Sequence, residues 1–142
     1  MSLKLNSKSD PEIMQNIFLI AAGGAIGASL RYLSGLIALK LFGKNNIITG
    51  TVFANLAGCF CAGFILAMTM NLSTENSYGY LFFSVGVIGS LSTFSTFILE
   101  LLMLAEKKSY AQLAAYLIVQ ITGVLITTYS GFWIYKLLSG DI

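Results

Sequence analysis

A run of hydroxyl and phenylalanine side chains stands inside an apolar stretch of the sequence, between Gly89 and Phe97. It reads GSLSTFSTF, with five hydroxyl groups and two phenylalanines three residues apart. The surrounding segment, Tyr80 to Leu104, is otherwise apolar, and a membrane interior has no water to satisfy hydroxyl groups. Non-helical backbone at membrane depth is tolerated only where protein buries it or a cavity wets it. The cluster therefore indicates a site that handles a small polar or charged species within the bilayer.

The two phenylalanines of this run, Phe94 and Phe97, would lie on nearly the same face of a helix. Phenylalanines at helical spacing are usually core residues, and the pattern alone favours that interpretation. Their setting among the hydroxyls of Ser95 and Thr96 favours the lining of a polar path instead. Aromatic rings have positive edges, so a ring edge can face an anion without trapping it as a lysine would.

Two further segments carry polar side chains at helical spacing. Thr51, Asn55 and Cys59 follow one another at intervals of four, and Tyr116 and Gln120 are also four apart. The Asn55 amide offers two N–H donors, either for a helix–helix hydrogen bond or for a permeating species. We favour the second role because Thr51 extends the polar stripe.

Charged residues within the apolar segments are few, and Arg31 and Glu100 are the two to explain. An arginine inside a membrane helix faces a partner or a wet cavity, or its long side chain extends to the membrane surface. We expect Arg31 in a vestibule or a structural role, and Glu100 near a helix end, in a vestibule or a packing contact.

The elements that must position these residues are four apolar stretches, each long enough to cross a bilayer, which takes about 20 helical residues. Apolar residues make up 56% of the chain and charged residues 10%. Gly23 and Gly27 in the first stretch form a G-x-x-x-G pair, which favours close helix packing. We predict an all-α integral membrane domain of four transmembrane helices, with a break in the third, over residues 16–140, after a short polar tail at 1–15. The predicted spans are Ile17–Leu39, Ile47–Met70, Tyr80–Leu104 and Ala111–Leu138.

Basic residues are nearly balanced between the two predicted membrane sides. Orientation follows the excess of Lys and Arg in short loops, and here the excess is small. One interpretation is a protein oriented weakly by one loop, and the other is dual topology, with copies inserted both ways and paired as antiparallel dimers. One side holds Lys4, Lys8 and Lys136, and the other holds Lys40, Lys44, Lys107 and Lys108.

Composition excludes several classes of function. A net charge of +2 is too small to indicate nucleic-acid binding, and the chain has no histidine. Cys59 and Cys61 would point to different faces of one helix, which disfavours a disulfide between them. With no further cysteine, a zinc or redox site is not expected. An enzyme is not expected either, because the sequence offers no nucleophile–base pair.

In this order and spacing, these motifs resemble the Fluc/CrcB family of fluoride channels over about Ile17 to Leu138. The resemblance rests on Gly23, Gly27, Arg31 and Tyr32, on Asn55 and Gly58, on Gly89 and Ser92 to Phe97, and on Tyr116. It implies passive fluoride export across a prokaryotic plasma membrane, which relieves fluoride toxicity. The alternative is a dual-topology small multidrug or cation transporter, which would need a buried carboxylate as its shared proton and cation site.

The resemblance also implies an assembly and a set of site residues. Family members are antiparallel dual-topology homodimers with two pores, although products of paired genes form heterodimers in some cases. A structural sodium ion would lie on the dimer axis, held by the backbone carbonyls of Gly89 and Ser92. Arg31 and Glu100 would belong to a vestibule. The implied fluoride pore comprises Thr51, Asn55, Phe94, Ser95, Thr96, Phe97, Tyr116 and Gln120.

Two positions depart from the family pattern. Ser92 stands where threonine is frequent, and a backbone carbonyl ligand should survive that change. Gln120 stands where many members have serine, and its bulkier amide would narrow the path or supply another donor.

Overall fold

The computed structural model describes residues 10–43, 48–70 and 77–140. The described part is helical and contains no strand. It has four helical segments long and apolar enough to cross a membrane, which confirms the predicted all-α class and number of spans. They are α1 (Asp10–Phe42), α2 (Gly50–Met70), a composite third segment (Tyr78–Glu106) and α6 (Tyr110–Ser139). Helix α1 begins earlier than the predicted span, so residues 10–15 of the predicted tail are helical.

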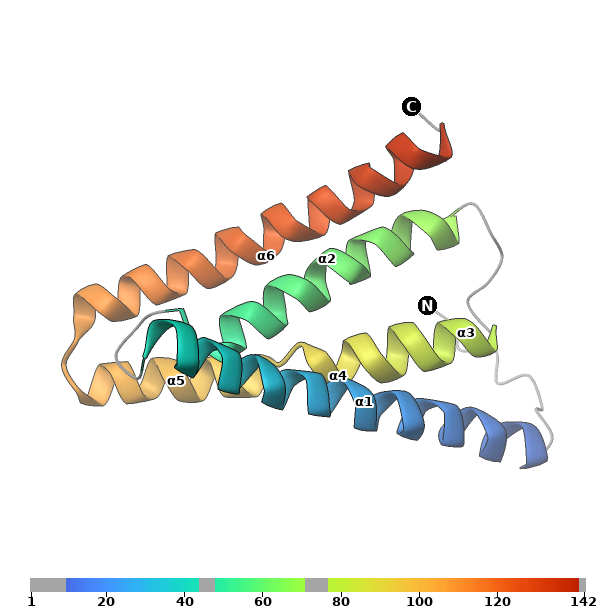
Figure 1. Cartoon of the computed structure of the whole chain (residues 1–142), viewed down its shortest axis with the longest axis horizontal. Helices are drawn as coiled ribbons and strands as arrows, with labels where there is room; N and C mark the ends of the chain where they lie inside the picture. Colours follow the sequence, from blue (N-terminus) through green and yellow to red (C-terminus); the bar gives the residue numbers. More distant parts are fainter. Residues whose placement is uncertain (1–9, 44–47, 71–76, 141–142) are drawn as a thin grey trace, which may run out of the picture.

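The segments lie beside one another in two groups (Figure 1). Helix α6 runs along α2, and α1 runs along the first half of the third segment. The C-terminal ends of α1 and of the third segment lie at the same end of the structure as the beginning of α6. Consecutive spans are therefore antiparallel, as their short connections predict.

Small residues allow both pairs of helices to approach closely. A Cβ atom added to Gly23 or Gly27 would overlap the carbonyl oxygen of Phe82 or Val87 in the third segment. Between α2 and α6, a Cβ at Gly63 would likewise overlap the carbonyl oxygen of Thr128. The predicted role of Gly23 and Gly27 as a helix contact is thus confirmed, since only a residue without a side chain fits there.

The third segment is interrupted in its middle, as predicted. It consists of α3 (Tyr78–Tyr80), the π-helix η1 (Leu81–Ile88), α4 (Gly89–Leu91) and α5 (Phe94–Glu106). Between α4 and α5, Ser92 and Thr93 are extended, with φ and ψ of −78° and 143°, and of −147° and 124°. The Thr93 hydroxyl then accepts a hydrogen bond from the Thr96 N–H at 3.4 Å and caps α5. The π-helical turn was not predicted; such turns recur at functional sites in helices.

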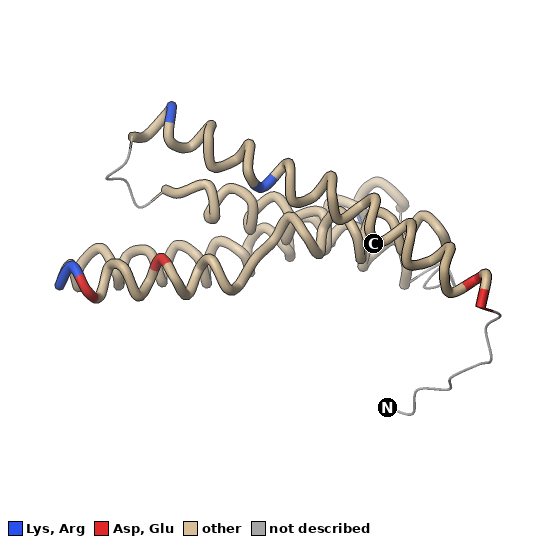
Figure 2. The backbone as a smooth tube through the Cα atoms, turned by 90° about the horizontal axis from the view of Figure 1, so that it is seen from below, with Lys and Arg blue, Asp and Glu red and all other residues tan. Residues whose placement is uncertain are grey.

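Charged residues gather mainly near the ends of the helices, with few further in (Figure 2). Lys40 lies in the last turn of α1, and Lys107 and Lys108 follow α5, so these three lie at one end. Lys136 lies in the last turn of α6, at the other end. Lys4, Lys8 and Lys44 lie outside the described residues, so the balance of charge across the membrane stays a prediction.

Candidate functional site

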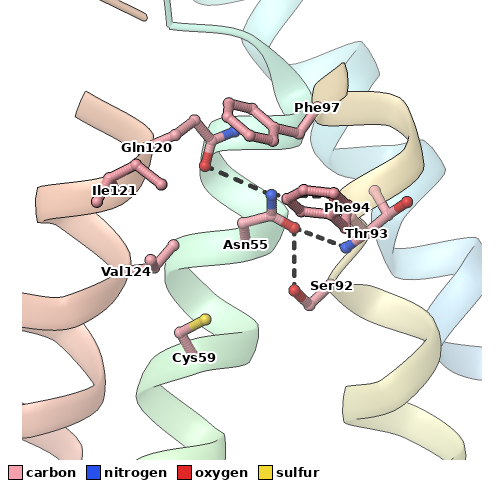
Figure 3. A pocket seen from close by; sticks show the side chains of 9 residues that line it. All are labelled: Asn55, Cys59, Ser92, Thr93, Phe94, Phe97, Gln120, Ile121 and Val124. Atoms are coloured by element: carbon pink, nitrogen blue, oxygen red, sulfur yellow. Dashed lines mark hydrogen bonds between the residues drawn. The ribbon is translucent and has the colours of Figure 1, made fainter. Parts of the chain in front are cut away.

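The centre of the site is the extended pair Ser92 and Thr93, which the side chain of Asn55 in α2 holds in place (Figure 3). Asn55 Oδ1 accepts the Thr93 N–H at 2.7 Å and the Ser92 hydroxyl at 3.1 Å. Asn55 Nδ2 donates to the Thr93 carbonyl at 3.2 Å. The amide thus pairs with both backbone groups of Thr93, which have no partner in the broken helix. The Ser92 N–H still donates to the Ile88 carbonyl at 3.1 Å.

Gln120 of α6 joins Asn55 from the other side (Figure 3). Its Oε1 accepts from Asn55 Nδ2 at 3.4 Å, and its Nε2 donates to the Tyr116 hydroxyl at 3.2 Å. With these bonds Asn55 uses two acceptor sites and both N–H donors, which is its full capacity. Asn55 therefore makes the helix–helix hydrogen bonds that were one of its two expected roles, while it also lines a cavity.

Glu100 of α5 is the partner of three hydroxyl groups. Its Oε2 accepts from the Tyr116 hydroxyl and, at 2.9 Å, from Thr49, and its Oε1 accepts from Thr51 at 2.6 Å. The sequence pattern did not indicate Thr49, and it predicted a vestibule or a packing contact for Glu100 without naming its partners. A signal was present, because Thr49 directly precedes α2, Thr51 lies in its first turn, and the chain has few intramembrane carboxylates.

These contacts make one continuous hydrogen-bonded path, which we call the polar track. It runs through three packed segments, from the hydroxyls at the start of α2 to the break before α5. Its members are Thr49, Thr51, Glu100, Tyr116, Gln120, Asn55, Ser92 and Thr93. Among the described side chains, no buried polar atom lacks a hydrogen-bond partner, so the track is complete without any bound species.

A cavity of about 160 Å³ opens beside the break. Phe94, Phe97, Asn55 and Gln120 line it together with Ser92, Thr93, Cys59, Ile121 and Val124. The two phenylalanine rings differ: Phe97 is 5% exposed and packs with Val52 and Tyr116, whereas Phe94 is 72% exposed. Their centroids are 5.6 Å apart. Phe97 is therefore a core residue that also lines the cavity, and Phe94 forms its open side.

A second, larger cavity of about 520 Å³ lies at the other end of the polar track. Arg31 and Glu100 line it, with Thr51 and Thr96 beside them. This is the arrangement expected of a vestibule, although their use by an ion stays a prediction. The polar track links the two cavities, because Thr51 and Glu100 face one while Asn55 and Gln120 face the other.

The remaining predicted residues lie around the break. The Ser95 side chain is exposed, with its Oγ 3.0 Å from the Thr93 hydroxyl, and Thr96 lies on the vestibule side. Gly89 is exposed, and a Cβ there would meet only the Ser84 carbonyl oxygen, at 3.8 Å. The structure thus brings together Thr51, Asn55, Glu100, Tyr116 and Gln120 and leaves Phe94, Ser95 and Gly89 exposed.

Comparison with known proteins gives one consistent result. The profile of a family described as "CrcB-like protein, Camphor Resistance (CrcB)" matches residues 18–132. A "Fluoride-specific ion channel FluC" of Haemophilus influenzae (strain PittGG) is 36% identical over 126 residues, covering 89% of this chain and 97% of the relative. A relative of the same name from Methanococcus vannielii is 42% identical, and the match covers 83% of this chain and 93% of the relative. Another, from Caulobacter sp. (strain K31), is 39% identical, and the match covers 72% of this chain and 80% of the relative.

Proposed function

The chain belongs to the CrcB family, and from this premise we propose that it is a fluoride-selective channel that lets F⁻ leave the cell down its gradient. The observation that carries the proposal is the polar track, a partly buried series of hydrogen-bonded amide, hydroxyl and carboxylate groups that ends at the cavity beside Phe94 and Phe97. The chain acts as a channel, not as an enzyme, in keeping with its family and the name its relatives carry.

The chemistry of the site suits a small, strongly hydrated anion. Such an ion crosses a membrane only if protein donors replace its water, and binding must be weak enough for the ion to leave. The described part of the track contains amide and hydroxyl groups, each hydrogen-bonded within the protein, together with the Glu100 carboxylate. It includes no lysine or arginine that would hold the ion tightly. Arg31 at the vestibule attracts anions toward the entrance.

Fluoride export has a simple thermodynamic purpose. Hydrogen fluoride is a weak acid that enters a cell uncharged and dissociates in a less acidic interior. The resulting F⁻ exceeds its outside concentration, so a passive pathway suffices for export. This purpose requires that the channel lie in the plasma membrane, as a multi-pass protein surrounded by lipid.

The assembly that we propose is an antiparallel homodimer with dual topology; a heterodimer with a related chain is the alternative. Support comes from the exposure of Phe94, Ser95 and Gly89 around the break. The Ser95 hydroxyl has one contact within the chain, to the Thr93 hydroxyl at 3.0 Å, and lipid cannot satisfy its remaining hydrogen-bonding capacity. A second copy placed against Phe94 would enclose the cavity beside it.

We also propose a structural sodium ion held by the residues that the family pattern assigns to it. Backbone carbonyls replace the hydration shell of monovalent cations, and the extended Ser92, with ψ of 143°, turns its carbonyl out of the helical direction. At Gly89 an added Cβ would meet only the Ser84 carbonyl oxygen, at 3.8 Å. The carbonyls of Gly89 and Ser92 in one copy are too few for a full shell, so the ion would sit between two copies and join them.

A multidrug or cation transporter is the less favoured function. Such a transporter needs a carboxylate free to exchange protons and a cationic substrate. Glu100 is instead held by the hydroxyls of Thr49, Thr51 and Tyr116. The names of the relatives also favour the channel.

Efflux from proteoliposomes tests the proposal. Vesicles loaded with fluoride and containing the purified protein should release F⁻ when a potassium ionophore balances the charge, and should retain chloride under the same conditions. Release of both anions at equal rates, or no release of fluoride, would contradict it. A proton-coupled uptake assay with an organic cation measures the alternative directly.

A further inference from the structure

The direction of each hydrogen bond around Gln120 is fixed from both ends of the polar track. At one end the backbone N–H of Thr93 can only donate, so the Asn55 atom 2.7 Å from it must be the oxygen. Asn55 Nδ2 therefore points toward Gln120, and the Gln120 atom that faces it at 3.4 Å must be the acceptor Oε1. Amide orientations are assigned from such networks, and this network permits one assignment.

The other end of the track imposes the same direction. The Tyr116 hydroxyl donates its hydrogen to the carboxylate of Glu100, so its oxygen is left to accept from Gln120 Nε2 at 3.2 Å. All three bonds from Asn55 to Glu100 consequently point the same way. Gln120 presents its negative end to Asn55 and its N–H donors to Tyr116.

This arrangement opposes an anion at the cavity beside the break. Asn55 and Gln120 both line that cavity, yet one Asn55 donor is engaged by Thr93 and the other by the Gln120 carbonyl oxygen. An anion that reaches the Asn55 amide meets the oxygen of Gln120 beside it. It must compete with that oxygen for the N–H group.

Rotation of the Gln120 amide removes the conflict without any movement of the backbone. The terminal torsion of glutamine is broad and roughly two-fold, and a half turn exchanges two groups of similar size within the same volume. Nε2 would then lie beside Asn55 Nδ2, and Oε1 would accept the hydroxyl hydrogen of Tyr116. Glu100 would keep the hydroxyls of Thr49 and Thr51 as partners.

We propose that the Gln120 amide is an anion-responsive switch: a fluoride ion in the cavity turns it by a half rotation, so that Asn55 and Gln120 donate to the ion together. The proposal rests on the proposed fluoride conduction and adds to it a role for a residue where the family often has serine. The same rotation shifts the Tyr116 hydroxyl from Glu100 to Gln120. Occupancy of one cavity thereby changes the hydrogen bonding of the other.

Three substitutions separate a rotating donor from a passive obstruction. Gln120→Glu keeps the shape but has no N–H group, and Gln120→Met keeps the length but neither donates nor accepts. Each should lower fluoride efflux by about tenfold or more, the loss expected for one hydrogen bond to an ion. Gln120→Ser keeps a rotatable donor and should retain more flux than either. The matched control is Gln112→Glu, the same change at an exposed position of the same helix, which should leave flux within about twofold.

A spectroscopic measurement on the unaltered protein tests the rotation directly, and it needs a variant only to assign one signal. The chain has three glutamines, Gln15, Gln112 and Gln120, so selective ¹⁵N labelling gives few side-chain amide signals. The signal that disappears in Gln120→Met belongs to Gln120, and fluoride titration should shift it while the Gln112 signal stays still. Chloride at the same concentration should shift neither.

The outcomes divide cleanly. Fluoride flux in the parent protein, loss of flux in Gln120→Glu and Gln120→Met, and a fluoride-dependent Gln120 signal support the switch. A rise in flux in Gln120→Met would overturn it, because the amide would then be only an obstruction. Unchanged flux in both variants, or a Gln120 signal that ignores fluoride, would also overturn it. Absence of flux in the parent protein would instead contradict the proposed function.

Discussion

The side chain of Asn55 pairs with both backbone groups of Thr93, accepting its N–H at 2.7 Å and donating to its carbonyl at 3.2 Å. One amide from α2 thereby replaces the two hydrogen bonds that Thr93 would make inside a helix. Asn55, 38 positions away in the chain, thus holds the break in the third segment. The orientation of Phe94, which follows the break, depends on this contact.

Asn55→Asp should therefore damage both stability and conduction. The carboxylate can still accept the Thr93 N–H, but it cannot donate to the Thr93 carbonyl or to Gln120, and a negative charge would repel fluoride. We expect fluoride flux below detection. The free energy of unfolding should fall by about 1–3 kcal/mol, the cost of an unsatisfied buried group. Asn55→Ser keeps one donor at shorter reach and should retain some flux. Equal fluoride efflux from liposomes that contain Asn55→Asp and from liposomes that contain the unaltered protein would contradict a role of Asn55 in permeation.

The two phenylalanines should respond differently to loss of the ring. Phe97 is buried, so Phe97→Ile should lower stability by about 1–3 kcal/mol as well as flux. Phe94 is largely exposed within the chain, so Phe94→Ile should lower flux strongly with little change in the stability of the protomer. Efflux together with detergent thermal melts distinguishes these effects. Normal conduction in both variants would mean that the rings serve packing alone.

Close packing in α1 predicts a sharp difference between two glycines of that helix. Gly27→Ala places a methyl group against the Val87 carbonyl and should reduce the folded yield and melting temperature markedly. Gly35→Ala meets nothing within 4 Å and should be tolerated. Size-exclusion profiles and thermal melts of both proteins measure the difference. Similar behaviour of the two variants would show that α1 can shift away from η1.

The sodium site makes a prediction about assembly. Ser92→Ala keeps the backbone carbonyl and loses only the hydroxyl bond to Asn55, so it should cost about 1 kcal/mol and preserve the dimer. The Cβ of Gly89→Val would meet only the Ser84 carbonyl oxygen, at 3.8 Å, so we attribute a loss of dimer and of sodium dependence in this variant to an interface with a second copy. Dimer fractions measured in sodium and in potassium test this. Severe loss from Ser92→Ala would indicate that the hydroxyl itself is the ligand.

Dual topology predicts that both orientations are present in one membrane. Labelling a single cysteine at Ser139, introduced into a chain without Cys59 and Cys61, should give about half reaction from each side. Two or three lysines added after Lys108 should bias insertion toward one orientation and reduce flux. Co-expression of a second copy that is biased toward the opposite orientation should recover the flux. A single orientation of the unaltered protein would contradict the antiparallel dimer.

The class of the protein, its four spans and the place of the break could all be predicted from the sequence. Apolar length decides whether a helix can cross a bilayer, and this property is local. The break was predictable because Gly86, Gly89 and the hydroxyls after them weaken the helix at membrane depth. The contact role of Gly23 and Gly27 was also predictable, because the spacing of small residues can be read within one segment of sequence.

Which polar side chains meet depends on how the helices pack, and the sequence did not predict it. Helical spacing shows that Tyr116 and Gln120 share a face, but not which helix that face opposes. Glu100 takes its partners from Thr49, Thr51 and Tyr116, which are 51, 49 and 16 positions away. The direction of the hydrogen bonds through Gln120 likewise depends on Thr93 at one end and Glu100 at the other. Such a network is a property of packed segments, because a hydrogen bond needs both atoms within about 3 Å and, apart from the bond between Gln120 and Tyr116, the partners lie on different segments.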